Sequence, residues 1–190
     1  MINQRTCIYL LLCGALFLSK LAHASDIDGR YRDNGNGTIT DSKTNLTWMR
    51  CSLGQQWTGT TCAGVAMEMN WNDALRTAMS FSYAGHSDWR VPTIDELDTL
   101  VYCSKGRKPS ARPNGKPVGD TSGRCLGDNY QKPTINIRAF PNTPANSYWS
   151  SSPNAYYSNY AWDVGFGYGY VGYDDKNYYD FHVRLVRAGQ

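Results

Sequence analysis

The sequence predicts a single α+β domain in which two helices pack on short antiparallel strands and disulfides staple the long loops. Two segments have the apolar spacing of amphipathic helices, and several short β-favouring runs are separated by Gly, Asn and Pro. Four cysteines follow residue 24, an even number that suits two disulfides. Residues 25–190 have the length of one domain.

Residues 1–24 have the pattern of a cleaved secretory signal peptide. Arg5 supplies the positive start, residues 8–18 are apolar, and residues 22–24 (Ala-His-Ala) match a small-x-small cleavage site. The apolar run is shorter than the about 20 residues that span a bilayer. Lipid attachment at Cys13 is an alternative, weakened because no small residue precedes this cysteine. We therefore expect export without a transmembrane span, to the cell surface or the extracellular medium, with the periplasm also possible.

Cleavage would also lower the charge of the chain. Arg5 and Lys20 would leave with the signal, so the formal net charge falls by two, from +3 to +1. A chain this close to neutral has no global attraction for nucleic acid or membranes. We expect neither as a partner.

The four cysteines that remain are Cys51, Cys62, Cys103 and Cys125. They allow three pairings, of which we prefer Cys51–Cys62 with Cys103–Cys125, because each pair would close a loop rich in turn-forming residues. Each bridge would contribute about 3 kcal/mol by the loop-entropy estimate. A four-cysteine zinc site is the alternative, but the Cys-x-x-Cys spacing is missing. We expect no metal and no cofactor.

The first strands are predicted around a hairpin turn. Two Asn-Gly dipeptides within residues 34–37 lie between short β-favouring runs. A calcium loop beginning at Asp33 is the alternative, but Gly35 and Gly37 would occupy ligand positions without offering a side-chain oxygen. The run Leu46–Met49 predicts the next strand.

The clearest helix is predicted over residues 70–84, with Asn70 as its N-cap and Gly85 at its end. Its apolar residues recur with helical spacing and predict one buried face: Trp71, Ala74, Leu75, Ala78 and Met79.

A second helix is predicted from a capping box, Thr93 followed by Glu96. Leu97, Leu100 and Val101 form its apolar stripe. Asp95, Glu96 and Asp98 are interpreted as capping or solvated residues rather than as a catalytic pair, because acidic residues suit the N-terminus of a helix.

Residues 104–138 form a basic, proline-rich loop. Eight cationic residues lie there against only two acidic ones, Asp120 and Asp128: Lys105, Arg107, Lys108, Arg112, Lys116, Arg124, Lys132 and Arg138. A solvated loop is the plain interpretation. The sharper hypothesis is a patch for anionic surface polymers such as sulfated glycans.

The stretch 148–187 holds nine of the fourteen tyrosines, interleaved with Asn, Asp, Ser and Gly. Such a mixture is costly in a core, where every polar group needs a partner, but it is typical of binding surfaces. Trp162, Val164 and Phe166 alternate as one face of a strand, with Asp163 and Gly165 on the other, and residues 181–187 predict a closing strand. The Tyr, Asn and Asp clusters fall between these runs.

Six short motifs occur in order along the chain. They are Gly37-Thr38-Ile39-Thr40-Asp41, Leu46-Thr47-Trp48-Met49-Arg50-Cys51, Trp71 with Ala74-Leu75, Asp88-Trp89-Arg90-Val91-Pro92-Thr93 with Glu96-Leu97, Tyr148-Trp149-Ser150-Ser151-Ser152, and Val183-Arg184-Leu185-Val186-Arg187. In this order they resemble the C-terminal domain of bacterial collagen-like surface adhesins. The resemblance covers nearly all of residues 30–187 and implies a C-type-lectin-like fold. The collagen-like Gly-x-y stalk of those adhesins is missing, so their trimeric state is not carried over.

The C-terminal forty residues carry a second resemblance, to the variable region of proteins diversified by retroelements. Tyr, Asn, Asp, Ser, Gly, Phe and His are among the products of randomising adenines in Asn codons. The resemblance implies a scaffold of Trp149, Trp162, Val164, Phe166, Val183 and Leu185. The ligand-binding residues, displayed on this scaffold, are expected to be Asn154, Tyr156, Tyr157, Asn159, Tyr160, Asp163, Tyr168, Tyr170, Tyr173, Asp174, Asp175, Asn177, Tyr178, Tyr179 and Asp180.

These observations predict an exported, surface-associated module that binds a protein or glycan ligand; its oligomeric state stays open. A fixed adhesin that binds sulfated polysaccharides through residues 104–138 is the alternative. Catalysis is not expected, although the superfamily includes oxidases that make formylglycine with a metal-bound cysteine pair. His86 and His182 lie far apart, and residues 150–152 lack a Gly-x-Ser-x-Gly elbow. The Glu-Pro-Asn and Gln-Pro-Asp motifs of calcium-dependent lectins are missing as well.

Overall fold

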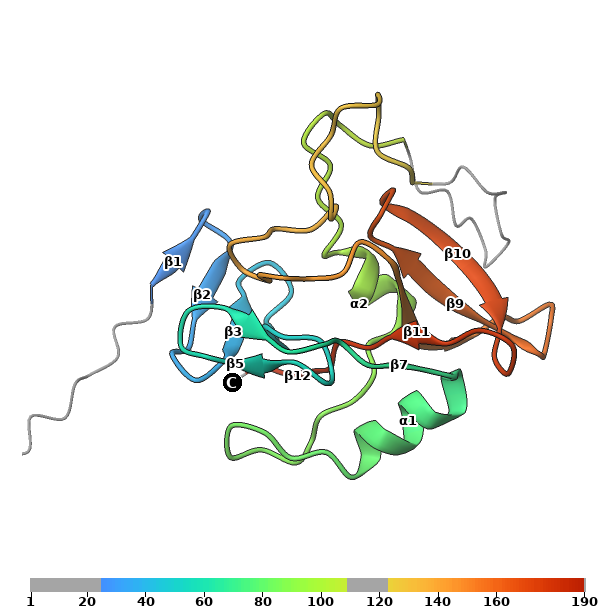
Figure 1. Cartoon of the computed structure of the whole chain (residues 1–190), viewed down its shortest axis with the longest axis horizontal. Helices are drawn as coiled ribbons and strands as arrows, with labels where there is room; N and C mark the ends of the chain where they lie inside the picture. Colours follow the sequence, from blue (N-terminus) through green and yellow to red (C-terminus); the bar gives the residue numbers. More distant parts are fainter. Residues whose placement is uncertain (1–24, 109–122, 190) are drawn as a thin grey trace, which may run out of the picture.

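The computed structural model describes residues 25–108 and 123–189. The predicted signal peptide and the middle of the basic loop, with Arg112 and Lys116, lie outside these residues. Within the described chain, small β-sheets combine with two short helices, in agreement with the predicted α+β class (Figure 1).

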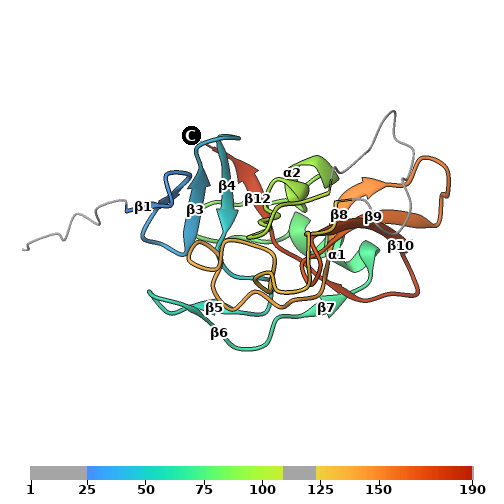
Figure 2. The ribbon, with the colours of Figure 1, turned by 90° about the horizontal axis from the view of Figure 1, so that it is seen from above.

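The first sheet is antiparallel and has five strands in the order β1-β2-β3-β4-β12. Its strands are β1 (Asp26–Ile27), β2 (Tyr31–Asp33), β3 (Thr38–Asp41), β4 (Leu46–Met49) and β12 (Val186–Ala188). The predicted Asn-Gly hairpin joins β2 to β3 and is confirmed. β12 brings the C-terminal end of the described chain alongside β4, so the two ends of the domain share one sheet (Figure 2).

The second sheet has the order β10-β9-β8-β11-β7 and contains most of the tyrosine-rich stretch. Its strands are β7 (Glu68–Met69), β8 (Ser147–Pro153), β9 (Tyr160–Gly165), β10 (Tyr170–Asp175) and β11 (Phe181–His182). A small third sheet pairs β5 (Gln56–Trp57) with β6 (Cys62–Ala63).

The single closing strand predicted over residues 181–187 is wrong. The chain forms β11 in the second sheet, crosses between the sheets over residues 183–185, and ends as β12 in the first. The crossing backbone is paired with the segment after β4, because Met49 and Leu53 donate their N–H groups to the carbonyls of Leu185 and Val183. Residues 183–185 are fully buried and link the two sheets.

Helix α1 (Trp71–Met79) begins at the predicted N-cap, where the Asn70 side chain accepts the N–H of Asp73. It ends five residues before the predicted Ala84. After Ser80 the chain turns back, so that Phe81 and Tyr83 pack on the core, and Ala84 and Gly85 form the turn at φ +52° and +80°. Met79, expected on the buried face, is 76% exposed.

Helix α2 (Ile94–Asp98) has the predicted capping box, with both of its reciprocal hydrogen bonds between Thr93 and Glu96. Leu97 and Leu100 are buried as expected, whereas Val101 is half-buried.

Two hydrophobic clusters cover the two faces of the second sheet. The first joins α2 and the first sheet to Trp162, Val164 and Phe166. The second joins α1 to Trp149, Ala161, Val183 and Leu185 on the opposite face. All six predicted scaffold residues are therefore buried, and the sheet is shielded on both sides.

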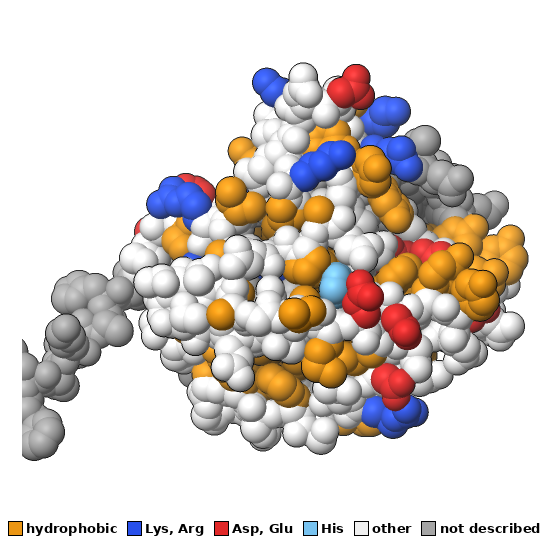
Figure 3. All heavy atoms as spheres, in the orientation of Figure 1, with side chains coloured by type: hydrophobic (Ala, Val, Ile, Leu, Met, Phe, Trp, Pro, Cys, Tyr) orange, Lys and Arg blue, Asp and Glu red, His pale blue; other side chains and the backbone are white. Residues whose placement is uncertain are grey.

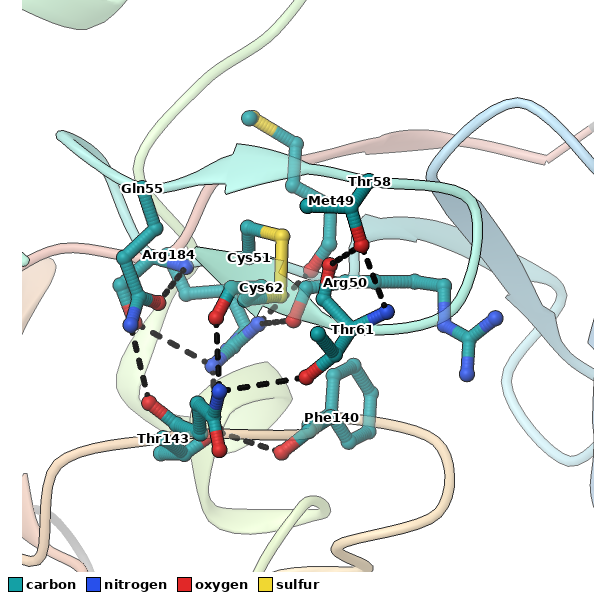
Figure 4. Close-up of a disulfide and its surroundings, with 12 residues drawn as sticks. Met49, Arg50, Cys51, Gln55, Thr58, Thr61, Cys62, Phe140, Thr143 and Arg184 are labelled. Atoms are coloured by element: carbon teal, nitrogen blue, oxygen red, sulfur yellow. Dashed lines mark hydrogen bonds between the residues drawn. A yellow bond between two sulfur atoms is a disulfide. The ribbon is translucent and has the colours of Figure 1, made fainter. Parts of the chain in front are cut away.

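Both preferred disulfides are formed. Cys51–Cys62 closes the loop that carries β5, and Cys103–Cys125 closes the basic loop, with Cα–Cα distances of 5.4 and 5.2 Å. The first bridge lies beside the buried crossing segment at Arg184 (Figure 4).

Candidate functional site

The loops after β8 and β10 meet at one end of the second sheet, at the right of Figure 1. The backbone N–H of Lys176 donates to the carbonyl of Asn159 over 2.9 Å, and its Nζ donates to the carbonyl of Ser158 over 2.7 Å. We call this end the loop-pair surface. It consists of Tyr156, Tyr157, Asn159, Tyr160, Tyr173, Asp175, Asn177, Tyr178, Tyr179 and Asp180, all exposed or half-buried.

One part of the loop-pair surface is a stack of tyrosine rings. Tyr157 stacks on Tyr173 with 5.9 Å between ring centroids, and Tyr160 meets Tyr173 edge-on at 5.8 Å. Tyr173 in turn packs edge-on against the buried Trp162 at 5.5 Å. The exposed ring of Tyr157 is thus held by the core rather than by solvent-exposed loop alone.

The other part of the surface rests on the opposite face of the sheet. Tyr179 stacks on Phe181 at 5.7 Å, and Phe181 lies 4.5 Å from the buried Trp149. Tyr178 is 82% exposed and touches Tyr179. Figure 3 shows orange side chains, the colour that includes tyrosine, gathered at this end of the molecule with acidic side chains beside them.

Helix α1 supports the loop after β10. The N–H of Trp71 donates to the carbonyl of Lys176, and the Lys176 ammonium lies 4.6 Å from the Trp71 ring. Asn72 donates to Asn177 over 3.4 Å. From the sequence, Trp71 was predicted only on the buried face of the helix, and no role was predicted for Lys176. The signal was the lone cation within the acidic run 174–180.

Tyr168 and Tyr170, both predicted to bind ligand, lie away from the loop-pair surface. They lie at the turn of the β9–β10 hairpin, whereas the loop-pair surface lies at its other end. A six-residue strand separates the two ends by about 17–20 Å. Tyr168 is 48% exposed and contacts the basic loop, with Arg124 and Lys132 at 5.2 and 4.7 Å from its ring. The half-buried Tyr170 ring covers Gly165, and burial raises the pKa of its hydroxyl.

Asn154 is buried, which contradicts its expected display. Only 4% of it is exposed. Its side-chain oxygen accepts the N–H groups of Tyr156 and Tyr157 over 2.9 and 3.2 Å. Asn154 therefore shapes the loop that presents these two tyrosines.

Asp163 is fully buried, which also contradicts its expected display. It lies on the face of β9 opposite Trp162, where Trp149 and Gly172 are its cross-strand neighbours. No hydrogen bond of ordinary geometry reaches either of its carboxylate oxygens from a described residue, although the Ser147 hydroxyl and the Asp174 carboxyl lie near them. Burial raises the pKa of Asp163 well above its ordinary value, and the nearby carboxyl of Asp174 raises it further. Burial also raises the pKa of the half-buried Asp174.

The described part of the basic loop contains structural as well as exposed cations. Arg107 forms an ion pair with Asp98 and donates to the carbonyls of Gly123 and Gly169. Lys105 and Lys108 are exposed. Arg107 therefore fastens the loop to the β9–β10 turn and is not free to hold a polymer.

Within residues 25–108 and 123–189, no three His, Cys, Asp or Glu side chains lie close enough together to hold a metal ion. The buried His182 ring makes contacts through both nitrogens, with the carbonyl of Met67 at 3.0 Å and the Glu68 carboxylate at 3.3 Å. Among the helices of these same residues, none is long and apolar enough to cross a membrane.

A family model described as the Lcl C-terminal domain covers residues 37–187. This family is an adhesin-type domain and is not a known enzyme family. No curated protein matches the chain. No solved structure matches it either.

Proposed function

Because the chain belongs to the Lcl C-terminal domain family, we propose that it is an exported, surface-associated module that binds a protein or glycan through the loop-pair surface. The adhesin-type family supports a binding role rather than a catalytic one. The two disulfides suit an oxidising location outside the cytoplasm, as expected for a chain with a cleaved signal peptide.

The observation that carries this proposal is the way exposed tyrosines are anchored. Tyr157 and Tyr179 are 52% and 42% exposed, yet each connects through one further aromatic ring to a buried tryptophan. Rings fixed in this way lose little conformational entropy on binding, and tyrosine is enriched among residues that dominate binding energy. Neighbouring Asn and Asp side chains add hydrogen-bonding groups for either class of ligand.

We also propose that the loop-pair surface is diversified by a retroelement on a C-type-lectin-like scaffold. The exposed positions are rich in the residues that arise from randomised Asn codons, whereas the scaffold between them is buried. A near-copy of the segment that encodes residues 150–187 is expected downstream of the gene, beside a reverse transcriptase, and should differ only where the copy has adenine. A genome that lacks this copy would rule out diversification and leave a fixed binding surface.

Binding is expected to be lost when Tyr156, Tyr157 and Tyr178 are replaced by Ala together. Removing three ring contacts should weaken affinity at least about 100-fold. The free energy of unfolding should fall by no more than about 2 kcal/mol, because the three side chains are exposed and only Tyr157 and Tyr178 lose ring contacts. Affinity would be measured on immobilised glycans and on intact cells, and stability by urea denaturation.

Tyr102→Ala is the matched control, since Tyr102 is 50% exposed but lies outside the loop-pair surface. It should retain full binding. Equal losses from Tyr102→Ala and from the triple variant would contradict the proposed site, as would unfolding of the triple variant, which would place these rings in the core.

A second candidate is a fixed adhesin for sulfated polysaccharides, favoured by the exposed Lys105 and Lys108 of the basic loop. It predicts that binding to a sulfated polysaccharide falls steeply between low and high salt. Neutralising Lys105, Lys108 and Arg112 should abolish this binding. Arg107, which sequence analysis grouped with them, should be left unchanged in this test because of its structural contacts. Binding that is insensitive to salt would exclude this candidate.

A further inference from the structure

A polar cavity of about 200 Å³ lies on the outer face of the first sheet, away from the loop-pair surface and from the basic loop. None of the described residues that line it is acidic. They are Arg32, Asn34, Asn36, Thr38, Thr40, Thr47, His86, Trp89 and Arg187. The sequence alone does not reveal this group, because its members come from four separate segments, at residues 32–40, 47, 86–89 and 187.

The floor of the cavity is a row of side chains that crosses four strands. Arg32, Thr40, Thr47 and Arg187 are successive cross-strand partners on β2, β3, β4 and β12. At about 4.8 Å per strand the Cα atoms of the two arginines are about 14 Å apart. The row therefore has a guanidinium group at each end and hydroxyl groups between them.

Most of the floor of the cavity is shielded from solvent although its side chains are polar. Thr40, Thr47 and Arg187 are only 7–8% exposed. The hairpin turn with Asn34 and Asn36 and the segment with His86 and Trp89 form the walls. A solvated sheet face needs no such cover, and buried polar groups cost free energy unless they find partners.

Internal hydrogen bonds fix the lining. The amide of Asn34 donates to the hydroxyls of Thr38 and Thr40 over 2.9 and 3.1 Å. The hydroxyl of Thr38 donates to the side-chain oxygen of Asn36 over 2.6 Å. The hydroxyl of Thr40 donates to the side-chain oxygen of Asn34 over 3.3 Å. The donors of Asn34, Thr38 and Thr40 are thus used internally, whereas the amide nitrogen of Asn36 makes no hydrogen bond to a described residue. The lining is therefore preorganised, and its hydroxyl oxygens keep a lone pair that can accept from a ligand hydroxyl.

The two arginines keep donors available as well. Arg187 uses Nε to donate to Asp88 over 2.8 Å, and its two terminal nitrogens make no hydrogen bond to a described residue. Arg32 forms no ion pair with a described residue, although Asp26 is its cross-strand neighbour on β1. The Asp88 carboxylate holds the guanidinium of Arg187 through Nε, so that its two terminal nitrogens have a fixed orientation. Two such N–H donors match the two oxygens of a carboxylate.

We propose that this cavity binds a monosaccharide-sized sugar acid, a hydroxylated ring with one carboxylate. The guanidinium group at one end of the row would hold the carboxylate. The Thr and Asn side chains, with the guanidinium group at the other end, would bond the ring hydroxyls. A volume of about 200 Å³ is smaller than the about 300–1,000 Å³ of sites for drug-sized ligands and suits a single ring. The low apolar content of the lining argues against a lipid chain or an aromatic ligand.

Calorimetric titration of the full chain with glucuronate, glucose and inorganic sulfate tests this assignment. Glucuronate is expected to bind at least about tenfold more tightly than glucose, which lacks the charge, and than sulfate, which lacks the ring hydroxyls. Arg32→Gln should weaken glucuronate binding several-fold with little risk to the fold, since Arg32 is exposed. Thr47→Val keeps the volume and removes one hydroxyl, and should also weaken it.

Two control variants separate this site from the others. Arg138→Gln changes another exposed arginine, and Tyr178→Ala changes the loop-pair surface; both should bind glucuronate as the unchanged protein does. Glucuronate that fails to saturate the folded protein would overturn the proposal. Sulfate binding as tight as glucuronate binding, or unaltered affinity in Arg32→Gln and Thr47→Val, would overturn it too.

Discussion

Replacing Arg184 with Ala is expected to lower the free energy of unfolding by about 3–5 kcal/mol. Arg184 is fully buried, and its guanidinium lies among the backbone around Cys51 (Figure 4). It donates to the carbonyls of Met49 and Arg50 and, over 2.7 Å, to the hydroxyl of Thr143. Without these donors the two carbonyls lose partners in the core, where an unsatisfied group costs free energy. Urea denaturation followed by circular dichroism would measure the loss.

Arg76→Ala is the matched control for this prediction. Arg76 lies on α1 with its side chain 67% exposed and forms an ion pair with Asp73 one turn earlier. Removing such an exposed pair should cost less than about 1 kcal/mol. Arg184→Met would keep much of the side-chain volume and still remove the donors, so it should remain strongly destabilising. If Arg184→Ala and Arg184→Met lower the free energy of unfolding no more than Arg76→Ala does, the buried guanidinium contributes little to stability.

The features predicted correctly from the sequence depend on short-range signals. The cap at Asn70, the capping box at Thr93 and the Asn-Gly hairpin each involve residues within a few positions of one another. Both disulfides were also expected because each closes a local loop. The alternation of Trp162 with its neighbours identified one buried face of β9 correctly.

The errors arose where a distant segment determines the environment. Alternation separated Asp163 from Trp162 but gave no information on what covers the second face of the sheet, which α1 and its cluster shield. The hairpin of β9 and β10 places Tyr168 in its turn, whereas Tyr157 lies in the loop that enters β9 at the other end, although composition made them equivalent. The crossing at residues 183–185 could not be predicted, because the sequence does not show that the residues before and after it pair with two different sheets.

The polar row of the first sheet illustrates a signal that was present and not used. Arg32, Thr40, Thr47 and Arg187 each sit beside a residue of the buried face in a short strand. Period-two alternation predicts that they share the other face. Their assembly into one cavity still depends on His86 and Trp89, which the sequence alone does not bring to this face.

The buried carboxyl of Asp163 is expected to make the protein less stable as the pH rises. Its folded-state pKa lies well above the ordinary value of 3.8, so the folded protein holds a proton that the unfolded chain releases. The stabilising effect is therefore complete below pH 3.8 and is lost as the pH rises through the folded pKa, with a slope of up to about 1.4 kcal/mol per pH unit. Asp163→Asn keeps the shape without the titration. It should match the unchanged protein near pH 4 and be more stable at pH 8, as measured by urea denaturation across this range.

The quantity to compare is the difference in unfolding free energy between each variant and the unchanged protein at each pH, because other groups titrate over the same range. Asp180→Asn removes an exposed carboxyl from the adjacent loop and should keep the slope of the unchanged protein. Asp174→Asn should reduce the total loss of stability between pH 4 and pH 8, since the carboxyl of Asp174 raises the pKa of Asp163. If Asp163→Asn instead loses stability equally at pH 4 and pH 8, the carboxyl does not hold a proton that the unfolded chain releases. The buried acid would then contribute to the stability of the hairpin beneath the loop-pair surface without making it depend on pH.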